Sequence, residues 1–312
     1  TIYGENLVMR ILDQTSPLLG LGELGFSPEN LERYNALIKK PYGIILVTGP
    51  TGSGKTTTLY ASLNMINSPS KNTITIEDPV EYRLKIIRQT QINPKAGITF
   101  ASGLRSILRQ DPDVIMIGEI RDAETSKIAI QAALTGHLVF STLHTNDAAE
   151  ALTRLRDMGV EPFLIASSVI GVVAQRLVRR ICFSCREAYD PGEEETRLIL
   201  GQTNDGSVPE LFRGKGCPKC KGTGYYGRMG IFELLVVNDG IRELISENGT
   251  SKMIKEVARN TLNMKTFRED GLEKALEGVT TLEEVNRMTF EDSPSLTASP
   301  SWKNSRNTGI LE

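Results

Sequence analysis

The first two-thirds of the chain alternates between short apolar runs and amphipathic stretches. Four near-continuous apolar runs, each bounded by glycine or polar residues, predict buried strands at 43–49, 72–78, 113–119 and 137–142. The stretches between them predict helices, notably at 54–66, 101–110 and 122–135. Ser27 as an N-cap and Pro28 at the first helical position predict a further helix over 27–40. Apolar strands alternating with helices indicate an α/β fold whose largely parallel sheet is covered on both faces.

The rest of the chain carries weaker patterns. The apolar run at 163–174 is too short for the roughly 20 residues of a membrane-spanning helix and predicts a buried core helix. Short amphipathic segments near the C-terminus predict a mostly helical part, in which a capping box opens the last helix at 281–289. Residues 292–312 are rich in Ser, Pro and Asn and predict a disordered tail. A strand-like alternation at 1–13 begins abruptly without an initiator Met, so we expect a missing upstream domain.

Composition narrows the classes of function. The chain of 312 residues has room for one large domain or two ordinary ones. Its 36 basic and 38 acidic side chains give a net charge of −2, which provides no broad attraction for nucleic acid or an anionic membrane. A nucleic-acid-binding protein is therefore disfavoured, although a local basic patch remains open.

The segment after the first predicted strand, GPTGSGKT, fits the phosphate-binding pattern G-x-x-x-x-G-K-[ST] between a strand and a helix. Its glycines allow backbone amides to turn toward phosphate oxygens at a helix N-terminus. We expect Lys55 to reach the outer phosphates and the Thr56 hydroxyl to bind Mg²⁺. The predicted nucleotide-binding residues are Gly49, Pro50, Thr51, Gly52, Ser53, Gly54, Lys55, Thr56 and Thr57.

Acidic side chains follow the second and third predicted strands. Glu77, Asp78 and Glu81 lie at the end of the second strand, and Glu119 lies at the end of the third. Loop acids are usually solvated, but acids clustered beside phosphates repel them unless a cation offsets the charge. An NTPase needs one acid for the Mg²⁺ shell and another to orient or deprotonate the attacking water. Glu119 is the candidate for the first role, although Gly118 stands where many such enzymes carry Asp, and Glu81 is the candidate for the second.

Arg105 and Arg109 stand four residues apart and therefore share one face of the predicted helix at 101–110. The spacing alone fits an amphipathic surface helix equally well. In a phosphate site, however, an arginine can be worth about 10³ to 10⁵ in rate. Both arginines are therefore candidates for contact with phosphate charge.

The two histidines of the chain, His137 and His144, flank the fourth predicted strand. At about 3.3 Å per residue a straight strand separates them by on the order of 20 Å, so they cannot share one metal ion. His144 lies at the end of the strand where ligands of α/β sheets bind, and there it could sense or stabilise the terminal phosphate. For His137, at the far end, packing, a subunit contact or a backbone hydrogen bond is the better expectation.

The four cysteines form two C-x-x-C pairs, Cys182 with Cys185 and Cys217 with Cys220. Each pair can present two thiolates to a tetrahedral Zn²⁺. Disulfides are the alternative, and they are disfavoured because a P-loop enzyme without a secretory signal belongs in the reducing cytosol. We therefore expect a structural zinc site of four thiolates, which has no open position for catalysis.

Four ordered motifs together resemble those of the secretion ATPases. GPTGSGKTTTLY, TIEDPVEY, LRSILRQDPDVIMIGEIRDAET and TGHLVFSTLHTNDA look like the Walker A motif, Asp box, Walker B region and His box of that family. The likeness is to the type II secretion ATPases and their relatives, the type IV pilus assembly and retraction ATPases. It covers residues 4 to about 291.

By position, the resemblance implies specific roles. It makes Lys55 and Thr56 ligands of ATP and Mg²⁺, Glu81 the general base and Glu119 the Walker B acid. It implies that Arg105 and Arg109 face phosphate, and it places both histidines in the segment that resembles the His box. Two further arginines match family residues that reach the nucleotide from other segments, namely Arg10 and Arg228.

The resemblance also implies an architecture. The expected core is a RecA-like P-loop NTPase domain at 17–178, preceded by the end of a truncated N-terminal domain at 1–16. A tetracysteine zinc module at 179–228 and a helical subdomain at 229–291 then lead to the tail at 292–312. The family's hexamers imply a ring in which neighbouring domains bracket each nucleotide.

The implied function is a Mg²⁺-dependent ATPase motor at the cytoplasmic face of the inner membrane. Its implied partners are a membrane platform protein and a cytoplasmic docking protein, with no nucleic acid. The tetracysteine motif resembles secretion and pilus assembly ATPases rather than retraction ATPases, and TRLRDMGVEPFLI and GVTTLEEV look closer to type II secretion. Type IV pilus assembly is the alternative, followed by a nucleic-acid translocase and a nucleotide-gated scaffold without turnover.

Overall fold

The computed structural model describes residues 2–9, 19–200 and 210–289. Arg10, the predicted tail at 292–312 and part of the predicted first domain lie outside these residues. The described strands are β1 (Gly43–Thr48), β2 (Thr73–Glu77), β3 (Arg88–Gln91), β4 (Val114–Ile117), β5 (Leu138–Leu143), β6 (Val169–Ile181), β7 (Arg186–Tyr189), β8 (Leu211–Gly214) and β9 (Tyr225–Val236).

Helices connect most of these strands. The α-helices are α1 (Pro28–Ile38), α2 (Lys55–Ile66), α3 (Phe100–Ile107), α4 (Ala123–Leu134), α5 (Ala148–Asp157), α6 (Pro162–Ser168), α7 (Glu193–Leu200), α8 (Asp239–Ser246), α9 (Ser251–Leu262), α10 (Phe267–Leu276) and α11 (Leu282–Met288). Three short 3-10 helices are η1 (Leu21–Glu23), η2 (Pro94–Ala96) and η3 (Leu108–Gln110). Among the described residues, no helix combines the length and the apolar character needed to span a bilayer.

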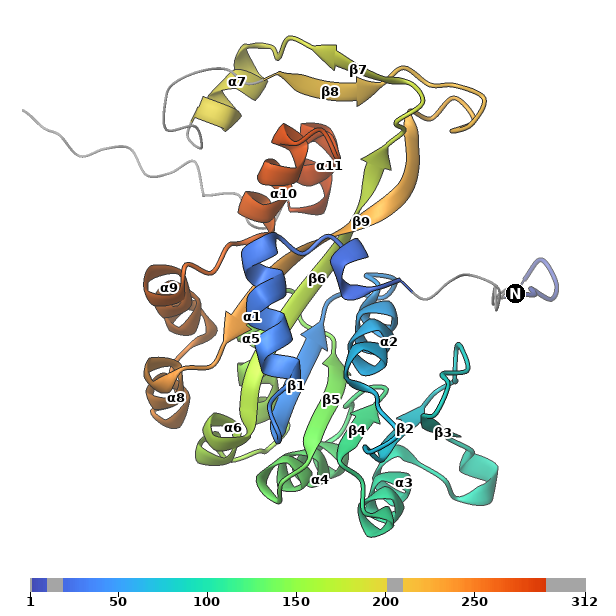
Figure 1. Ribbon diagram of the computed structural model, residues 1–312, viewed down its shortest axis with the longest axis vertical. Helices are drawn as coiled ribbons and strands as arrows, with labels where there is room; N and C mark the ends of the chain where they lie inside the picture. Colours follow the sequence, from blue (N-terminus) through green and yellow to red (C-terminus); the bar gives the residue numbers. More distant parts are fainter. Residues whose placement is uncertain (1, 10–18, 201–209, 290–312) are drawn as a thin grey trace, which may run out of the picture.

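Seven strands form one sheet in the order β3-β2-β4-β5-β1-β6-β9 (Figure 1). All neighbouring pairs are parallel except β6 and β9, which are antiparallel. This arrangement confirms the predicted α/β class and the largely parallel sheet. The four predicted strands correspond to β1, β2, β4 and β5, and each differs from its predicted range by one or two residues at most at either end.

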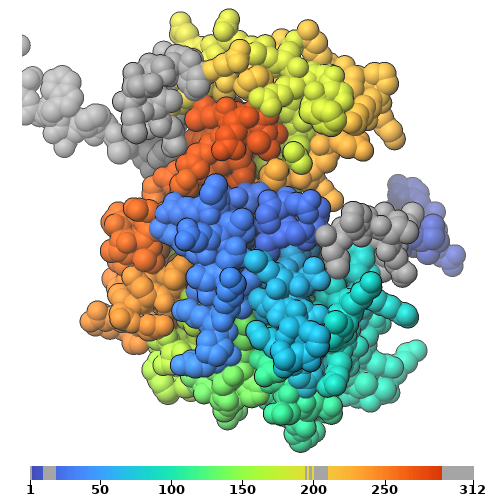
Figure 2. All heavy atoms as spheres, viewed as in Figure 1, coloured from blue at the N-terminus to red at the C-terminus, as the bar shows by residue number. Residues whose placement is uncertain are grey.

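The centre of the sheet is covered on both faces, since every residue of β1, β2, β4 and β5 is buried. Ile44 and Leu46 of β1 pack into one core with residues of α3, α4 and α5. Ile45 and Val47 point to the other face and pack against α1 and α2. Figure 2 shows the side chains of α1 and α2 covering this second face of the sheet.

The predicted core helix at 163–174 is wrong in its second half. Helix α6 ends at Ser168, and the chain continues as strand β6. The residues after Ser168 are mostly β-branched, which favours a strand, and Ile44 and Leu46 of β1 pair with Val169 and Val172. A continuous apolar run has no period that separates a helix from a buried strand.

Other strands also have no counterpart among the predicted ones. Strand β3 reads RQTQ and has no apolar residue, and β7 and β8 lie within the predicted zinc module. Strand β9 begins in that module and continues into the part that was expected to be mostly helical. At the N-terminus, residues 2–9 form no strand despite their alternation. Helices α8 to α11 follow β9.

Strands β6 and β9 extend beyond the sheet and carry the cysteine-containing segment (Figure 1). There β7 and β8 form a separate antiparallel pair, and a small third core joins residues of β8, α10 and α11. The division into domains stays a prediction, and two strands cross its boundaries: β6 continues past residue 178, and β9 continues past residue 228.

Candidate functional site

The loop between β1 and α2, residues 49–54, brings the predicted glycine-rich segment to the carboxyl end of β1. Gly49 has a φ of 143°, and a Cβ on it would lie 2.3 Å from the carbonyl oxygen of Gln175 on β6. Only glycine fits this close approach. The loop leads into the N-terminus of the 12-residue helix α2, where backbone N–H groups are available to an anion.

Lys55 begins α2 and folds back over the loop. Its Nζ donates to the carbonyl oxygens of Gly49 and Pro50 at 2.8 and 3.0 Å. Burial lowers the pKa of Lys55, and the negative charge of Glu119 acts in the opposite direction. Thr56 and Thr57 follow in the first turn of α2 and are half-buried. The ammonium group therefore lies at the phosphate-binding loop, with an acid close enough to influence it.

Glu119 lies two residues after the carboxyl end of β4. One of its carboxylate oxygens is 2.5 Å from Nη2 of Arg121, and the other is 3.7 Å from Nε2 of His144. Its side chain is only 14% exposed. The hydroxyl of Thr142 on β5 donates to the carbonyl oxygen of Gly118 at 2.7 Å, which keeps the two strand ends together. The predicted Walker B acid and the predicted phosphate-sensing histidine therefore lie side by side.

The surroundings of His144 favour its neutral form. Burial lowers its pKa below the usual 6.5, and the positive charges of Lys55 and Arg121 lower it further, while Glu119 opposes them. A neutral imidazole at neutral pH can donate from one nitrogen and accept at the other. His144 can therefore serve as a hydrogen-bonding partner in this site without adding a full charge.

His137 lies at the opposite end of β5 and has a different environment. Its Nδ1 lies 2.8 Å from the carbonyl oxygen of Ala132 in α4. A backbone hydrogen bond was one of the three expectations for this residue. The intervening strand also confirms that the two histidines cannot share a metal ion.

Glu77, the last residue of β2, is buried below the predicted base Glu81. Its carboxylate accepts hydrogen bonds from the hydroxyl of Tyr60, from Thr75 at 2.5 Å and from Gln89 at 3.1 Å. The Tyr60 hydroxyl in turn accepts the backbone N–H of Glu81 at 3.3 Å. Burial, together with the acceptor Glu77, raises the pKa of Tyr60, which stays protonated as a donor. The backbone of Glu81 is therefore held in place by Tyr60 of α2, the helix that follows the phosphate-binding loop.

Strand β3 holds the other side of the segment that carries Glu81. Gln91 accepts the N–H of Val80 at 3.2 Å, and Gln89 accepts the N–H of Leu84 at 2.7 Å. These bonds explain why β3 is polar. A recess of about 510 Å³ borders this segment and is lined by Val80, Glu81, Tyr82, Arg83, Leu84, Ile87, Gln89 and Gln91.

The side chains of Arg105 in α3 and Arg109 in η3 contact residues outside the phosphate-binding loop. Arg105 is exposed and pairs with Glu124 of α4 at 2.6 Å. Arg109 is exposed in η3, where the neighbouring Gln110 accepts a hydrogen bond from Asn72 at the amino end of β2. The phosphate-binding loop lies at the carboxyl ends of the strands. Within one protomer, the structure therefore does not bring Arg109 to the loop.

Arg228 is exposed on β9, opposite Arg179 of β6. The part of β6 that borders the phosphate-binding loop is Gln175 to Leu177, because both side chains lie within 4 Å of a Cβ built on Gly54. Arg228 is therefore beyond the stretch of sheet that meets the loop. Arg10 lies outside the described residues.

Sequence reasoning missed two residues of this site. Arg121 forms the ion pair with Glu119, and Tyr60 links Glu77 to the backbone of Glu81. Arg121 could have been suspected because it follows Glu119 by two residues. Tyr60 had no signal, since a tyrosine in an apolar helix usually indicates core packing.

The four cysteines converge between β6, β8 and β9, and their sulfurs all lie within 4.8 Å of one another. Closest approaches are 3.8 Å between Cys182 and Cys217, 3.9 Å between Cys185 and Cys220, and 3.7 Å between Cys217 and Cys220. Four thiolates at a Zn–S distance of about 2.3 Å lie about 3.8 Å apart at the corners of a tetrahedron. The spacing therefore fits a four-thiolate metal site.

The electrostatics of the cluster also fit a metal site. Burial opposes ionisation of Cys220, but the N–H groups of Cys217 and Gly224 donate to its sulfur and lower its pKa to about 6. Burial and the neighbouring thiols raise the pKa of Cys185 to about 12. A cation bound among the sulfurs favours the thiolate form of all four cysteines, and so compensates for the effects of burial and of the neighbouring thiols.

Comparisons with known proteins agree with the arrangement. The family model described as Type II/IV secretion system protein matches residues 1–287. The type IV pilus assembly ATPase PilB of Thermus thermophilus is 56% identical over 291 residues, which are 93% of this chain and 33% of PilB. The type II secretion system ATPase E of Vibrio cholerae is 54% identical over 290 residues, covering 93% of this chain and 57% of that protein.

Among solved structures, the pilus retraction motor PilT with bound ADP is similar with a TM-score of 0.66. It is 31% identical, and the match covers 88% of this chain and 68% of that chain. The chain thus spans about a third to somewhat over half the length of the curated relatives named here. With a family match over residues 1–287, the chain belongs to the Type II/IV secretion system protein family of ATPases.

Proposed function

We propose that the chain hydrolyses ATP at the loop between β1 and α2. The observation that supports this most directly is the meeting of Lys55, Glu119 and His144 at the carboxyl ends of three neighbouring strands, β1, β4 and β5. Open α/β sheets bind their ligands at this edge. The phosphate-loop amides and Lys55 bind the phosphates, and His144 faces the same centre as a neutral hydrogen-bonding group.

Mg²⁺ is the cofactor that this chemistry requires, and the residues present suit it. Glu119 offers a largely buried carboxylate beside the first turn of α2, and Thr56 offers a hydroxyl in that turn. These oxygens would hold the ion, which would neutralise charge on the phosphates during hydrolysis. Arg121 pairs with Glu119 and orients its carboxylate.

Glu81 is the proposed base for the attacking water. It lies in a segment held from below by Tyr60 and from the side by the glutamines of β3, so its backbone position is fixed. The recess beside it gives a water molecule access to its carboxylate. A base of this kind contributes about 10² to 10⁴ in rate.

The exposed arginines suit a ring in which protomers complete each other's sites. Arg105, Arg109 and Arg228 are all exposed, and Arg109 lies at the opposite end of the strands from the loop of its own protomer. A neighbouring copy can place such groups against the terminal phosphate, where a guanidinium stabilises transition-state charge. We propose a homo-hexamer, to which Arg10 also contributes, and in which hydrolysis changes the orientation of adjacent domains.

Zinc is proposed as the resident metal of the four cysteines. Cys182, Cys185, Cys217 and Cys220 would bind it in a closed tetrahedral site that stabilises the segment between β6 and β9. This site has a structural role, because four thiolates leave no position for a substrate.

At the level of the cell, we propose a motor for type II protein secretion by pseudopilus assembly. It would act at the cytoplasmic face of the inner membrane with a platform protein and a docking protein. The identity to the secretion ATPase E of Vibrio cholerae supports this role, and the slightly higher identity to PilB supports type IV pilus assembly as the second candidate. Gene neighbourhood separates the two roles.

The substitution Glu81→Gln tests the proposed hydrolysis. Because the phosphate loop is untouched, we expect ATP binding to stay within about twofold and phosphate release to fall by about 100-fold or more. Binding of a fluorescent ATP analogue and phosphate release from assembled rings measure the two quantities. Glu161→Gln, an exposed position at the start of α6, serves as the control and should behave as the parent.

Two outcomes would redirect the proposal. Parent-rate turnover by Glu81→Gln would remove Glu81 from the role of base, and ATP binding without turnover by the parent rings would favour a nucleotide-gated scaffold. A translocase on nucleic acid would show DNA affinity that falls steeply with salt concentration. We expect no such binding from a chain with a net charge of −2.

A further inference from the structure

The segment that joins β5 to α5, residues 144–147, borders the proposed active site. His144 contacts Glu119 at 3.7 Å. Thr145 donates its N–H to the hydroxyl of Thr48 at 3.0 Å, and the two threonine hydroxyls are 2.7 Å apart. Thr48 is the last residue of β1 before the phosphate-binding loop. The segment is therefore attached to the base of the loop on one side.

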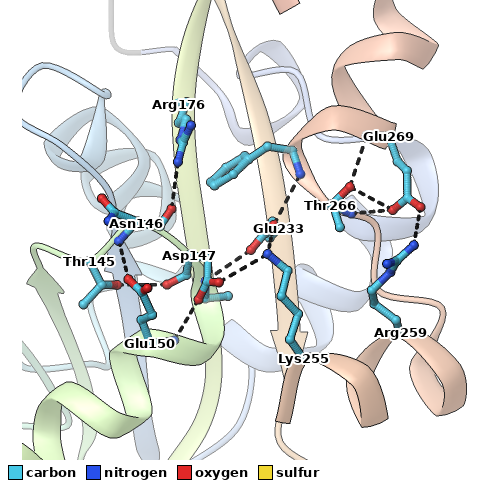
Figure 3. A network of polar contacts seen from close by, with 12 residues as sticks. Thr145, Asn146, Asp147, Glu150, Arg176, Glu233, Lys255, Arg259, Thr266 and Glu269 are labelled. Atoms are coloured by element: carbon cyan, nitrogen blue, oxygen red, sulfur yellow. Dashed lines mark hydrogen bonds and ion pairs between the residues drawn. The ribbon is translucent and has the colours of Figure 1, made fainter. Parts of the chain in front are cut away.

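On its other side, the same segment is tied to the C-terminal helices. Asp147 caps α5 with one oxygen, which accepts the N–H of Glu150 at 2.8 Å. The other oxygen lies 3.2 Å from Nζ of Lys255, a residue of α9. That ammonium group also lies 3.1 Å from a carboxylate oxygen of Glu233 on β9 (Figure 3). Lys255 thus stands between two carboxylates from different elements.

Glu233 is the buried centre of this junction. It is fully buried, and it accepts the N–H of Ala148 at 3.2 Å and the N–H of Phe267 at 3.4 Å. Nearby, Nη2 of Arg176 donates to the carbonyl oxygen of Asn146 at 3.2 Å (Figure 3). Four elements, α5, β9, α9 and α10, therefore meet directly behind the segment that carries His144.

The charges at the junction depend on Lys255. Burial raises the pKa of Glu233 to about 7, and Lys255 acts in the opposite direction, while Asp147 adds to the rise. Without the ammonium group, nothing opposes the effect of burial and Glu233 takes up a proton. Asp147 then loses the ionic partner that holds its second carboxylate oxygen beside α9.

We propose that Lys255 is a positioning residue for ATP hydrolysis, acting through Asp147 on residues 144–147 and so on the contact between His144 and Glu119. The inference rests on the proposed hydrolysis at the phosphate-binding loop. It assigns to α9 a role in the chemistry, although no atom of Lys255 contacts the loop itself in the described ion pairs. It also links the C-terminal helices to the nucleotide.

Lys255→Met tests the inference because it removes the charge and keeps most of the side-chain length. We expect kcat to fall by about 10- to 100-fold, since a displacement of about 1 Å can cost this much. The Kd for ATP should stay within about twofold, because Lys55 and the loop are unchanged. Lys252→Met, an exposed position on the same helix, is the matched control and should leave both values at the parent level.

The double variant Glu233→Gln/Lys255→Met separates positioning from folding. A neutral carboxamide can stay buried and still accept the N–H of Ala148. The double variant should therefore recover any thermal midpoint that is lost in Lys255→Met. The inference predicts that kcat stays low in the double variant, because Asp147 still lacks its partner. Recovery of kcat together with the thermal midpoint would overturn it and leave Lys255 as a purely structural residue.

A second readout does not depend on turnover. The chain has two histidines, so ring NMR signals report separately on His144 and on His137 at the far end of β5. In Lys255→Met we expect the His144 signals to shift and broaden and the His137 signals to stay. Unchanged His144 signals would overturn the inference, whether or not the parent chain hydrolyses ATP. ATP binding without hydrolysis by the parent chain would count only against the proposed hydrolysis.

Discussion

Glu284 shows how a single buried charge fixes a distant helix to the sheet. Its carboxylate, fully buried in α11, accepts hydrogen bonds from the backbone and guanidinium of Arg179 on β6 at 2.8 to 3.0 Å. Arg287 adds two more at 2.6 and 2.9 Å. Burial opposes its ionisation, but the two guanidinium groups outweigh that effect and lower its pKa to about 2.

Replacing this charge should reveal a pH-dependent loss of stability. We expect Glu284→Gln to lower the free energy of unfolding by about 2 kcal/mol at pH 7, a value discounted because both arginines are partly exposed. The folded pKa lies below the usual 4.5, so the stabilisation is complete above that pH and is lost as the pH falls toward 2. Denaturant unfolding of both proteins at pH 7, 4 and 3 measures the difference. If the difference in free energy of unfolding between the two proteins stayed constant with pH, the destabilisation would come from the shape of the side chain and not from its charge.

Single residues were predictable from the sequence where a motif fixes their place. Lys55 and Glu119 follow strands whose carboxyl ends share one edge of the sheet, so their meeting could be expected. Tyr60 and Lys255 could not be found in this way. Their roles depend on hydrogen-bonding and ionic partners that are remote in sequence, such as Glu77 and Asp147.

At the scale of elements, two glycines between the cysteine pairs and β9 differ in a way that can be tested. Gly224 has a φ of 74°, and a Cβ on it would lie 2.5 Å from the carbonyl oxygen of Gly214. Gly222 has a φ of 79°, but a Cβ there would meet nothing within 4 Å. The two positions share the left-handed backbone conformation and differ in the space available.

We therefore expect Gly224→Ala to be more harmful than Gly222→Ala. Both substitutions incur roughly 1 kcal/mol for the left-handed conformation, and Gly224→Ala adds about 1 to 3 kcal/mol for the clash between backbones. It should also weaken zinc binding, because the N–H of Gly224 donates to Cys220. Thermal unfolding and a zinc-chelator competition measure both effects, and equal losses in the two variants would contradict the expectation.

Elements were predictable where the apolar pattern had a clear period and clear ends. Strands β1, β2, β4 and β5 match because each is a short apolar run bounded by glycine or polar residues. The run containing α6 and the start of β6 failed because its apolar residues are continuous. Strand β3 failed for the opposite reason, since its side chains bind a loop and none is apolar.

For the whole molecule, the cysteine cluster predicts a dependence on metal. We expect one zinc per chain by elemental analysis. Removal by a strong chelator should release hydrogen-exchange protection in β7 and β8, whose own core is small, and should spare the seven-stranded sheet. A metal-free preparation with full protection in β7 and β8 would contradict the prediction.

The continuity of β6 has a mechanical consequence. Near its middle, Gln175 touches Gly49 of the phosphate-binding loop, and about 20 Å further on the same strand ends beside Cys182. Antiparallel pairing with β9 runs over most of that length and makes β6 stiffer than a single strand. A small rotation of β6 at the loop therefore displaces the end of the strand beside the cysteines by a larger distance, because displacement grows with distance from the point of rotation.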